Sequence, residues 1–313
     1  MSDETLSGGL EAAGTQRQDG FDLSQWSARR LERVEHALSD WVVADAPAGL
    51  GETMRYAVLD GGKRLRPLLV LAACEAVHGN EAAALRAACA VELIHAYSLV
   101  HDDMPCMDND VLRRGKPTVH VKFGQAQALL AGDALQALAF ELLAPDGTAV
   151  PAQMQATLCR LLARSAGHAG MAGGQAIDLA SVGRSLDEAQ LREMHRRKTG
   201  SLLQASVMMG AACGAASATA LSRLAAYGAA VGLAFQVVDD MLDVTADSAT
   251  LGKTAGKDAA QEKPTYVSVL GLDGSAAFAR TLLEQALQAL AASGLKDTRA
   301  LHALATMVVN RDN

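Results

Sequence analysis

The sequence predicts an all-α protein, and three features of its composition favour that class. Only 7 of its 313 residues are proline, and only 11 are aromatic (2 Trp, 4 Tyr and 5 Phe). Half of the residues are apolar, many of them in long stretches rich in Ala and Leu. These features disfavour sheets and favour helices that pack closely through small side chains. We therefore expect one helical bundle with a large buried core.

Apolar periodicity and breaking residues predict the elements in order. Residues 1–21 show little periodicity, so we expect a mobile tail followed by a single domain over residues 22–313. Ser24 is a candidate cap for the first helix, and Ser185 and Glu188 fit a capping box for a later one. Strand-like alternation and internal repeats are absent. The expected helices cover residues 24–41, a short stretch up to 60, 67–78, 81–103, 120–143, a stretch from 151 that breaks near 167–174, 185 to beyond 198, 217–245, and two amphipathic helices towards the C-terminus.

Two of these helices must lie inside the bundle. Residues 81–103 and 217–245 are apolar on nearly every side, which is typical of a buried helix. Pro67 suits the first turn of its helix, because the N–H that it lacks would make no intrahelical bond there. Pro105 helps to end the helix over 81–103.

Charge and cysteine usage exclude several classes of function. The formal net charge is −7 and no long basic run occurs, so nucleic acid is a poor candidate partner. No uninterrupted apolar run reaches about 18 residues, so no membrane span is expected. The polar, acidic N-terminus fits neither a secretory signal nor a transit peptide. Five scattered cysteines without a CxxC pair argue against a zinc site or a disulfide framework. We expect a cytoplasmic protein.

Carboxylates cluster at the ends of the two apolar helices. The first cluster contains Asp102, Asp103 and Asp108, and the second contains Asp239 and Asp243, which share a helical face. One such pair alone would most simply mark a solvated helix end. Two clusters of repelling charges instead favour neutralisation by a cation. Oxygen ligands without cysteine select hard cations, and Mg²⁺ commonly shares its ligand shell with phosphates.

Basic residues alternate with the acidic clusters along the chain. Lys63 and Arg66 precede a helix whose N-terminus could help to hold an anion. Any single basic pair is ordinarily a solvated surface charge. Together, however, the basic residues suit a diphosphate that is bridged to the acids by Mg²⁺. The remaining members of this set are Arg113, Arg114, Lys198 and Lys253.

Seven motifs in one register carry a resemblance to a known family. From about residue 30 to the C-terminus, the chain resembles the short-chain trans-isoprenyl diphosphate synthases, most closely the bacterial farnesyl diphosphate synthases. Asn109 departs from the pattern, since an acid is often found there, but it lies outside the DDxxxxD ligands. The motifs are GGKRLRP at 61–67, DDMPCMD at 102–108, RRG at 113–115, GGQAIDL at 173–179, KTG at 198–200, FQVVDDMLD at 235–243 and LGK at 251–253.

The resemblance implies a bundle of the isoprenoid synthase type with a central active-site cavity, and it implies a homodimer. It also implies that an allylic diphosphate ionises, is attacked by isopentenyl diphosphate and loses a proton, which the released diphosphate can accept. Three Mg²⁺ ions would stabilise the charge that develops on the leaving diphosphate. The metal ligands carried over are Asp102, Asp103, Asp108, Asp239 and Asp243.

The resemblance also assigns the two substrates to residues. Thr199 and Gln236 would place oxygens near the carbocation, beside Lys198. Isopentenyl diphosphate would be held by Lys63, Arg66, His95 and Arg114, and the allylic diphosphate by Arg113, Lys198, Thr199, Gln236 and Lys253. Alone on an apolar helix, His95 would be a core residue.

Several neighbouring residues have expected supporting roles. Gln175 and Asp178 could orient the site, and we interpret His101 and Cys106 as structural. Arg311 either closes over the isopentenyl site or belongs to a frayed terminus.

Tyr97 and Ser98 are the candidate determinants of product length. Tyr97 lies five residues before Asp102, about 7.5 Å along a helix, and is the only aromatic residue in 81–104. An ideal helical wheel places Tyr97 off the Asp102 face and Ser98 almost beneath Asp102. In the family that the chain resembles, an aromatic residue at the fifth position is typical of farnesyl synthases. We therefore expect a fifteen-carbon product.

Three other functions remain open from the sequence. A geranyl or geranylgeranyl diphosphate synthase would keep the fold and change the product. A metal-dependent phosphohydrolase could use the pair His101-Asp102, but it would leave the second acidic cluster unexplained. A non-catalytic subunit would be expected to lose one acidic cluster, and both are intact.

Overall fold

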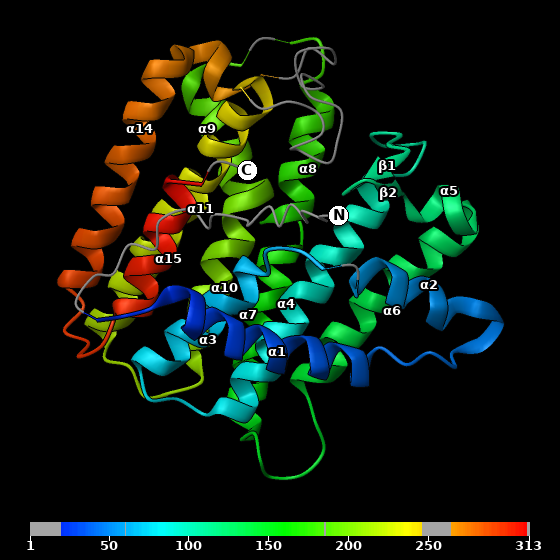
Figure 1. The fold of residues 1–313 in the computed structure, drawn as a ribbon, viewed down its shortest axis with the longest axis horizontal. Coiled ribbons are helices and arrows are strands. Elements are labelled where there is room, and N and C mark those ends of the chain that lie inside the picture. Colours follow the sequence, from blue (N-terminus) through cyan, green and yellow to red (C-terminus); the bar gives the residue numbers. More distant parts are fainter. Residues whose placement is uncertain (1–19, 60, 185, 246–263, 312–313) are drawn as a thin grey trace, which may run out of the picture.

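The computed structural model describes residues 20–59, 61–184, 186–245 and 264–311, and it confirms the all-α class (Figure 1). Helices make up nearly all of the described regular structure. The first half of the chain forms α1 (Leu23–Trp41), the 3-10 turn η1 (Pro47–Gly49), α2 (Leu50–Val58), α3 (Leu65–Ala76), α4 (Glu81–Asp102), the strands β1 (Leu112–Arg113) and β2 (Lys116–Pro117), α5 (Val119–Phe123) and α6 (Gln125–Leu143).

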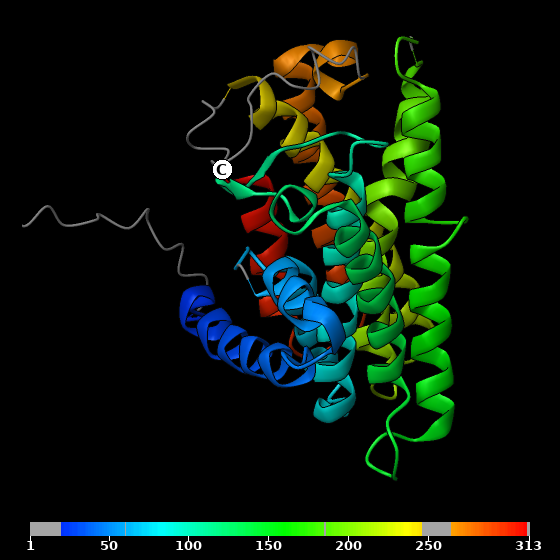
Figure 2. The ribbon, with the colours of Figure 1, turned by 90° about the vertical axis from the view of Figure 1, so that its right-hand side faces the viewer.

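The second half of the chain completes the bundle. In Figure 2, α7 and α8 stand nearly end to end along one edge, separated by the break that the glycines at 167–174 predict. The elements of this second half are α7 (Ala152–Ala166), α8 (Met171–Ala180), α9 (Glu188–His195), the π-helical turn η2 (Arg196–Gly200), α10 (Ser201–Ala212), α11 (Ala218–Thr245), α14 (Tyr266–Ala291) and α15 (Arg299–Val309).

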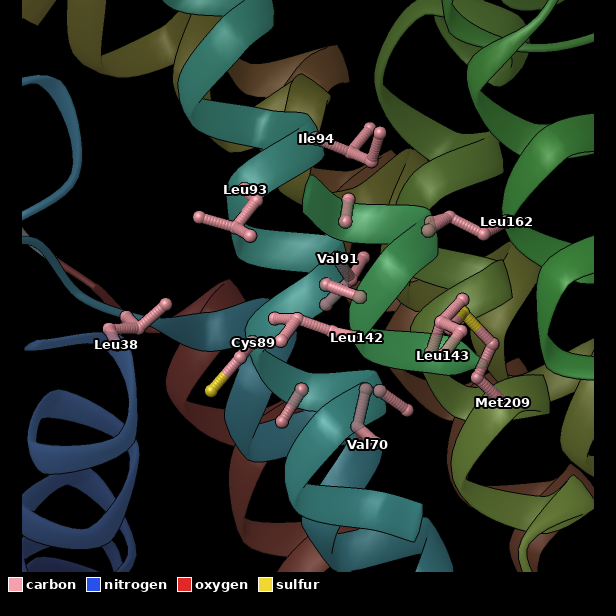
Figure 3. Packing of buried hydrophobic residues seen from close by; sticks show 14 of the residues in the cluster. Leu38, Val70, Cys89, Val91, Leu93, Ile94, Leu142, Leu143, Leu162 and Met209 are labelled. Atoms are coloured by element: carbon pink, nitrogen blue, oxygen red, sulfur yellow. The ribbon is translucent and has the colours of Figure 1, made fainter. Parts of the chain in front are cut away.

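Helix α4 is the centre of the larger core. It packs against α3, α6 and α10, and most of its residues are buried. In Figure 3 the consecutive residues Leu93 and Ile94 leave α4 on opposite sides, and both side chains are fully buried. The prediction of a helix that is buried on all sides is therefore confirmed. Its C-terminal residue, Asp102, is carried to the edge of that core.

Three local expectations were wrong. Asp22, not Ser24, caps α1, because its side chain accepts a hydrogen bond from the backbone N–H of Gln25. The capping box of α9 is formed by Asp187 and Gln190 instead of Ser185 and Glu188. The helix expected over 120–143 is divided into α5 and α6 by Gly124, whose φ of 89° favours glycine.

A hairpin that the sequence did not predict carries the arginine pair. Strands β1 and β2 pair antiparallel, with Arg113 opposite Lys116. Arg114 and Gly115 form the turn, and both have positive φ, as a tight hairpin turn requires. The hairpin lies near the end of α4, because the intervening loop folds back onto that helix.

Helices α4, α6 and α11 are long and apolar enough to cross a membrane when judged by length and composition alone. In the structure all three pack against other helices, α4 on α6 and α11 on both α10 and α14, so packing inside the bundle explains their composition. Leu129 and Leu130 of α6 nevertheless remain about half exposed. The homodimer that the resemblance implies stays a prediction.

Candidate active site

The first acidic cluster is assembled by a loop that returns to the end of α4. The backbone N–H of Asp108 donates to the carbonyl of Asp102 (2.9 Å), which brings the two residues together. The pKa of Asp102 is raised to about 6, chiefly by burial and also by the neighbouring Asp108 and Asp103, while the charges of Lys198 and Arg113 act in the opposite direction. A cation bound next to this carboxylate would stabilise its charged form.

Asp103 has a protein partner of its own. Arg113 reaches it from the hairpin, with its Nε 2.9 and 3.0 Å from the two carboxylate oxygens and its Nη2 2.5 Å from one of them. Asp103 is buried, so this two-pronged ion pair fixes both side chains. The structure thus pairs a predicted metal ligand with a predicted diphosphate ligand, and both roles stay predictions.

The second acidic cluster lies at the end of α11. Asp239 forms an ion pair with Arg311 (2.5 Å), whose guanidinium also donates to the carbonyl of Phe235 (2.8 Å) and lies over its ring (3.9 Å). The pKa of Lys63 is lowered by burial and by Arg311 and raised by Asp239, so these three charges are neighbours. Arg311 is therefore held at this cluster and does not fray away from it. Asp243, one turn further along α11, is buried.

Lys198 and Thr199 stand on the π-helical turn. The Nζ of Lys198 donates to Asp178 of α8 (2.5 Å), and the expectation that Asp178 orients the site stays a prediction. The hydroxyl of Thr199 donates to the side-chain carbonyl of Gln236 on α11 (2.7 Å). A π-helical turn widens the helix by one residue, which is a common device for presenting functional side chains.

Glycines let neighbouring backbones approach this turn. A Cβ atom at Gly174 of α8 would lie 2.1 Å from the backbone nitrogen of Lys198. On the other side, a Cβ atom at Gly232 of α11 would lie 2.9 Å from the Cα of Gly200. The position of the turn is thus defined by backbone contacts, which leave no room for a side chain.

The basic side of the site faces the start of α3. The Nε of Arg66 is buried and has no hydrogen-bond partner among the described residues, as expected of a group that awaits an anion. Arg114 donates to the carbonyl of Gly61. Burial holds the pKa of His95 well below its usual range, and nearby guanidinium groups lower it further, so His95 is neutral; these groups belong to Arg66, Arg114, Arg113 and Arg64.

Arg64, which the sequence did not single out, organises the loop before α3. Its buried guanidinium bonds Glu35 (2.6 Å), Glu92 (2.8 Å) and the carbonyl of Val58 (2.7 Å). Glu92, the only acid between residues 82 and 101, was the available signal, because a lone charge on a buried helix needs a partner. This network holds the backbone that presents Lys63 and Arg66.

A cavity of about 390 Å³ extends from the acids of α4 into the bundle. Its wall includes Asp102, Lys198 and Thr199 at one end, and it also includes both candidate chain-length residues, Tyr97 and Ser98. The expected central cavity is therefore present. Gln236 lies behind Thr199 and lines a smaller neighbouring cavity of about 60 Å³.

Two further residues of the cavity wall differ in what they bond. His101 lines the cavity, so our interpretation of it as purely structural is incomplete, although its Nε2 lies 3.1 Å from the carbonyl of Leu129. Both polar side-chain atoms of Gln175 are buried without partners among the described residues. Gln175 is thus available to a ligand. Cys106 is exposed and lies outside the cavity wall.

The carboxylates fit Mg²⁺ as a shared ligand of protein and substrate. Within the described ranges, no three Asp, Glu, His or Cys side chains converge on one point. Mg²⁺ does not require such a cage, because it is usually bound by one or two carboxylates, several waters and substrate phosphates. The half-buried pair Asp102 and Asp108 offers such a donor set. The number of ions stays a prediction, and Lys253 lies outside the described residues.

Comparisons with known proteins find relatives that match most of the chain. A family profile described as "Polyprenyl synthetase" matches residues 47–304. A chloroplastic geranylgeranyl pyrophosphate synthase of Catharanthus roseus is 43% identical over 294 residues, which cover 94% of this chain and 82% of that protein.

Solved structures show the same fold. A putative farnesyl-diphosphate synthase from a Marinomonas species is 39% identical, with a TM-score of 0.80 over 93% of this chain and 100% of that one. A geranyltransferase from Helicobacter pylori, solved with magnesium and isoprenyl diphosphate, is 34% identical, with a TM-score of 0.80 over 92% of this chain and 96% of that one.

Proposed function

This chain belongs to the polyprenyl synthetase family and is a prenyltransferase that makes short-chain prenyl diphosphates, and we propose that its product is farnesyl diphosphate. Isopentenyl diphosphate and dimethylallyl or geranyl diphosphate are the proposed substrates. The family shows the class of reaction and leaves the chain length to be argued from the cavity.

The proposed reaction divides the two diphosphates between the two sides of the site. Arg66 and Lys63 bind isopentenyl diphosphate, next to the neutral His95. Lys198, held by Asp178, binds the allylic diphosphate. Asp102, Asp108 and Asp239 would hold Mg²⁺, which would supply positive charge to stabilise the leaving diphosphate. The Helicobacter pylori neighbour, solved with magnesium and isoprenyl diphosphate, supports this choice of metal.

The position of Tyr97 in the cavity wall is the observation that supports the proposed product length. It lines the cavity one and a half turns from Asp102, on the path that a growing apolar chain would take into the bundle. The edge of its ring meets the ring of His101 at a centroid distance of 5.7 Å. Burial raises the pKa of Tyr97 above its usual value, and a hydrogen bond with Gln136 of α6 only partly offsets this increase. A side chain supported at both ring and hydroxyl is suited to stop the chain.

We expect Tyr97→Ala to shift the product from fifteen towards twenty carbons. Truncation removes the ring from the cavity wall and leaves a void next to the end of the chain, at a cost in stability of a few kcal/mol. The measurement is chromatography of radiolabelled products made from isopentenyl and geranyl diphosphates with Mg²⁺. Tyr97→Phe is the matched control, because it keeps the ring and should keep the fifteen-carbon product. An unchanged product from a folded, active Tyr97→Ala variant would remove Tyr97 from this role.

The second candidate product is geranylgeranyl diphosphate, favoured by the names of the plant relatives. Several proteins with that name are 43–44% identical to this chain over 94–97% of its length. A twenty-carbon product from the wild-type enzyme, at equal concentrations of both substrates, would establish this candidate and exclude farnesyl specificity.

A further inference from the structure

A chain of buried hydrogen bonds leads away from the cavity behind Thr199. The hydroxyl of Thr199 donates to the Oε1 atom of Gln236 (2.7 Å). The Nε2 atom of Gln236 in turn donates to Oδ1 of Asp240 (2.8 Å). The other carboxylate oxygen of Asp240 accepts the backbone N–H of Tyr266 at the start of α14 (2.7 Å). Both oxygens of Asp240 are therefore engaged by groups of the protein.

The chemistry of each side chain determines which atom donates and which accepts in this series of hydrogen bonds. An ionised carboxylate only accepts hydrogen bonds, so Gln236 must turn its NH₂ group towards Asp240. Its carbonyl then faces Thr199, which must donate its single hydroxyl hydrogen. Thr199 lines the main cavity, so the oxygen lone pairs of its hydroxyl are left facing the substrate.

The carboxylate of Asp240 has a fixed position in the interior of the bundle. Asp240 is 2% exposed, and the Nε2 atom of His195 lies 3.8 Å from its Oδ2 atom. Burial lowers the pKa of His195 to about 4, so this imidazole is neutral near pH 7. The hydrogen bonds from Gln236 and from the backbone N–H of Tyr266 help to stabilise the buried carboxylate of Asp240.

We propose that Asp240 is a positioning residue that acts through Gln236 to keep the lone pairs of Thr199 directed at the carbocation. A fixed oxygen dipole stabilises positive charge as it develops and needs no reorganisation during the reaction. In this assignment the two neighbouring acids of α11 differ in role. Asp239 binds the metal, whereas Asp240 determines which way the hydrogen bonds from Thr199 and Gln236 point. The inference rests on the proposed prenyl transfer but not on the length of the product.

Asp240→Asn should reverse the direction of donation along this series of hydrogen bonds. The backbone N–H of Tyr266 still requires an acceptor, so the new amide must turn its oxygen there and its NH₂ group towards Gln236. Gln236 then flips, its own NH₂ group faces Thr199, and the hydroxyl hydrogen of Thr199 is left pointing into the cavity. We expect kcat to fall about 10- to 100-fold, the range found for residues that orient catalytic groups. The two Michaelis constants and the Mg²⁺ concentration for half-maximal activity should change by no more than about twofold.

A compensating change separates this role from metal binding. Adding Gln236→Glu to Asp240→Asn restores every donor and acceptor, since the new carboxylate accepts from both the new amide and Thr199. We expect the double variant to have at least tenfold higher kcat than Gln236→Glu alone, in which two carboxylates face each other. This comparison remains valid if Asp240→Asn alone does not fold. In the double variant, Thr199→Val should lower kcat by the same factor as in the wild type.

The assay is total incorporation of labelled isopentenyl diphosphate, counted for all chain lengths. Wild-type incorporation of zero would overturn the proposed function itself. With an active wild type, full activity of Asp240→Asn would overturn only this inference. So would a double variant no better than Gln236→Glu, or a Mg²⁺ requirement that rises in Asp240→Asn as much as in Asp239→Asn.

Discussion

The two acidic clusters begin with the same Asp-Asp pair, yet each pair contains two different environments. In both, the second acid is 2% exposed and bonded to protein: Asp103 to Arg113, and Asp240 to Gln236 and Tyr266. The first acids differ from them, since Asp102 lines the cavity and Asp239 meets only the C-terminal Arg311 among the ion pairs of the described chain. Acids of the same type therefore differ in burial, because the second acid of each pair is enclosed by protein groups while the first lies at the cavity or is partly exposed.

The strongest test of this comparison removes the first acid of each pair. Asp102→Ala and Asp239→Ala should each lower kcat by about a thousandfold or more, because each removes a proposed ligand of the ions that would stabilise the leaving diphosphate. Steady-state assays with saturating substrates would measure the loss, and a chelator should abolish wild-type activity. Asp146→Ala, an exposed acid after α6, is the control and should be fully active. Near-normal turnover in either cavity variant would refute the two-cluster mechanism.

The raised pKa of Asp102 predicts that the α4 cluster loses metal as the pH falls. Burial disfavours the charged carboxylate, so a proton competes with the metal once the pH drops below about 6. Below that value, affinity should fall about tenfold per pH unit. Titration with Mn²⁺ in place of Mg²⁺, without substrate and followed by electron paramagnetic resonance, would measure it. Thermal melts at each pH serve as the control for folding, and a constant affinity from pH 7.5 to 5 would contradict the prediction.

The smallest expected effect concerns the α11 cluster, where Arg311 competes with the metal for Asp239. The Asp239 side chain is 42% exposed, so the ion pair is worth less than about 1 kcal/mol. Arg311→Ala should accordingly lower the Mg²⁺ concentration for half-maximal activity by up to about fivefold. Arg299→Ala, which breaks a surface pair with Asp297, is the matched control and should have no effect. A rise in the Mg²⁺ requirement of Arg311→Ala would show that Arg311 assists binding.

The long helices and the order of the motifs were predictable from the sequence because both are local signals. The acids at the ends of α4 and α11 follow directly from two apolar stretches. Contacts between distant segments were not predictable. Tyr266 meets Asp240 across 26 residues, and Arg113 meets Asp103 only after the loop has folded back. No periodicity in one segment encodes the partner supplied by another.

The same limit explains the misjudged residues. His101 has the pattern of a packing residue at a helix end, and only the structure shows that α6 approaches its ring and that the residue also lines the cavity. A Cβ atom at Gly132 of α6 would lie 2.0 Å from the Nε2 of His101, so that approach depends on a glycine in another helix. Arg64 lies between Lys63 and Arg66 in one basic motif. Its buried partner Glu92 comes from another helix, so the sequence alone does not distinguish its structural role from their predicted binding roles.

For enzyme engineering, the glycine contacts around the π-helical turn divide the cavity into parts that differ in mutational tolerance. Gly174 and Gly232 touch backbone atoms, which cannot move aside as the end of a flexible side chain can. A library for directed evolution would therefore leave these positions unchanged. Diversity is better placed at Tyr97 and Ser98, whose side chains line space rather than backbone. The diphosphate-binding end of the enzyme is thus resistant to variation, while its hydrocarbon-binding end is open to it.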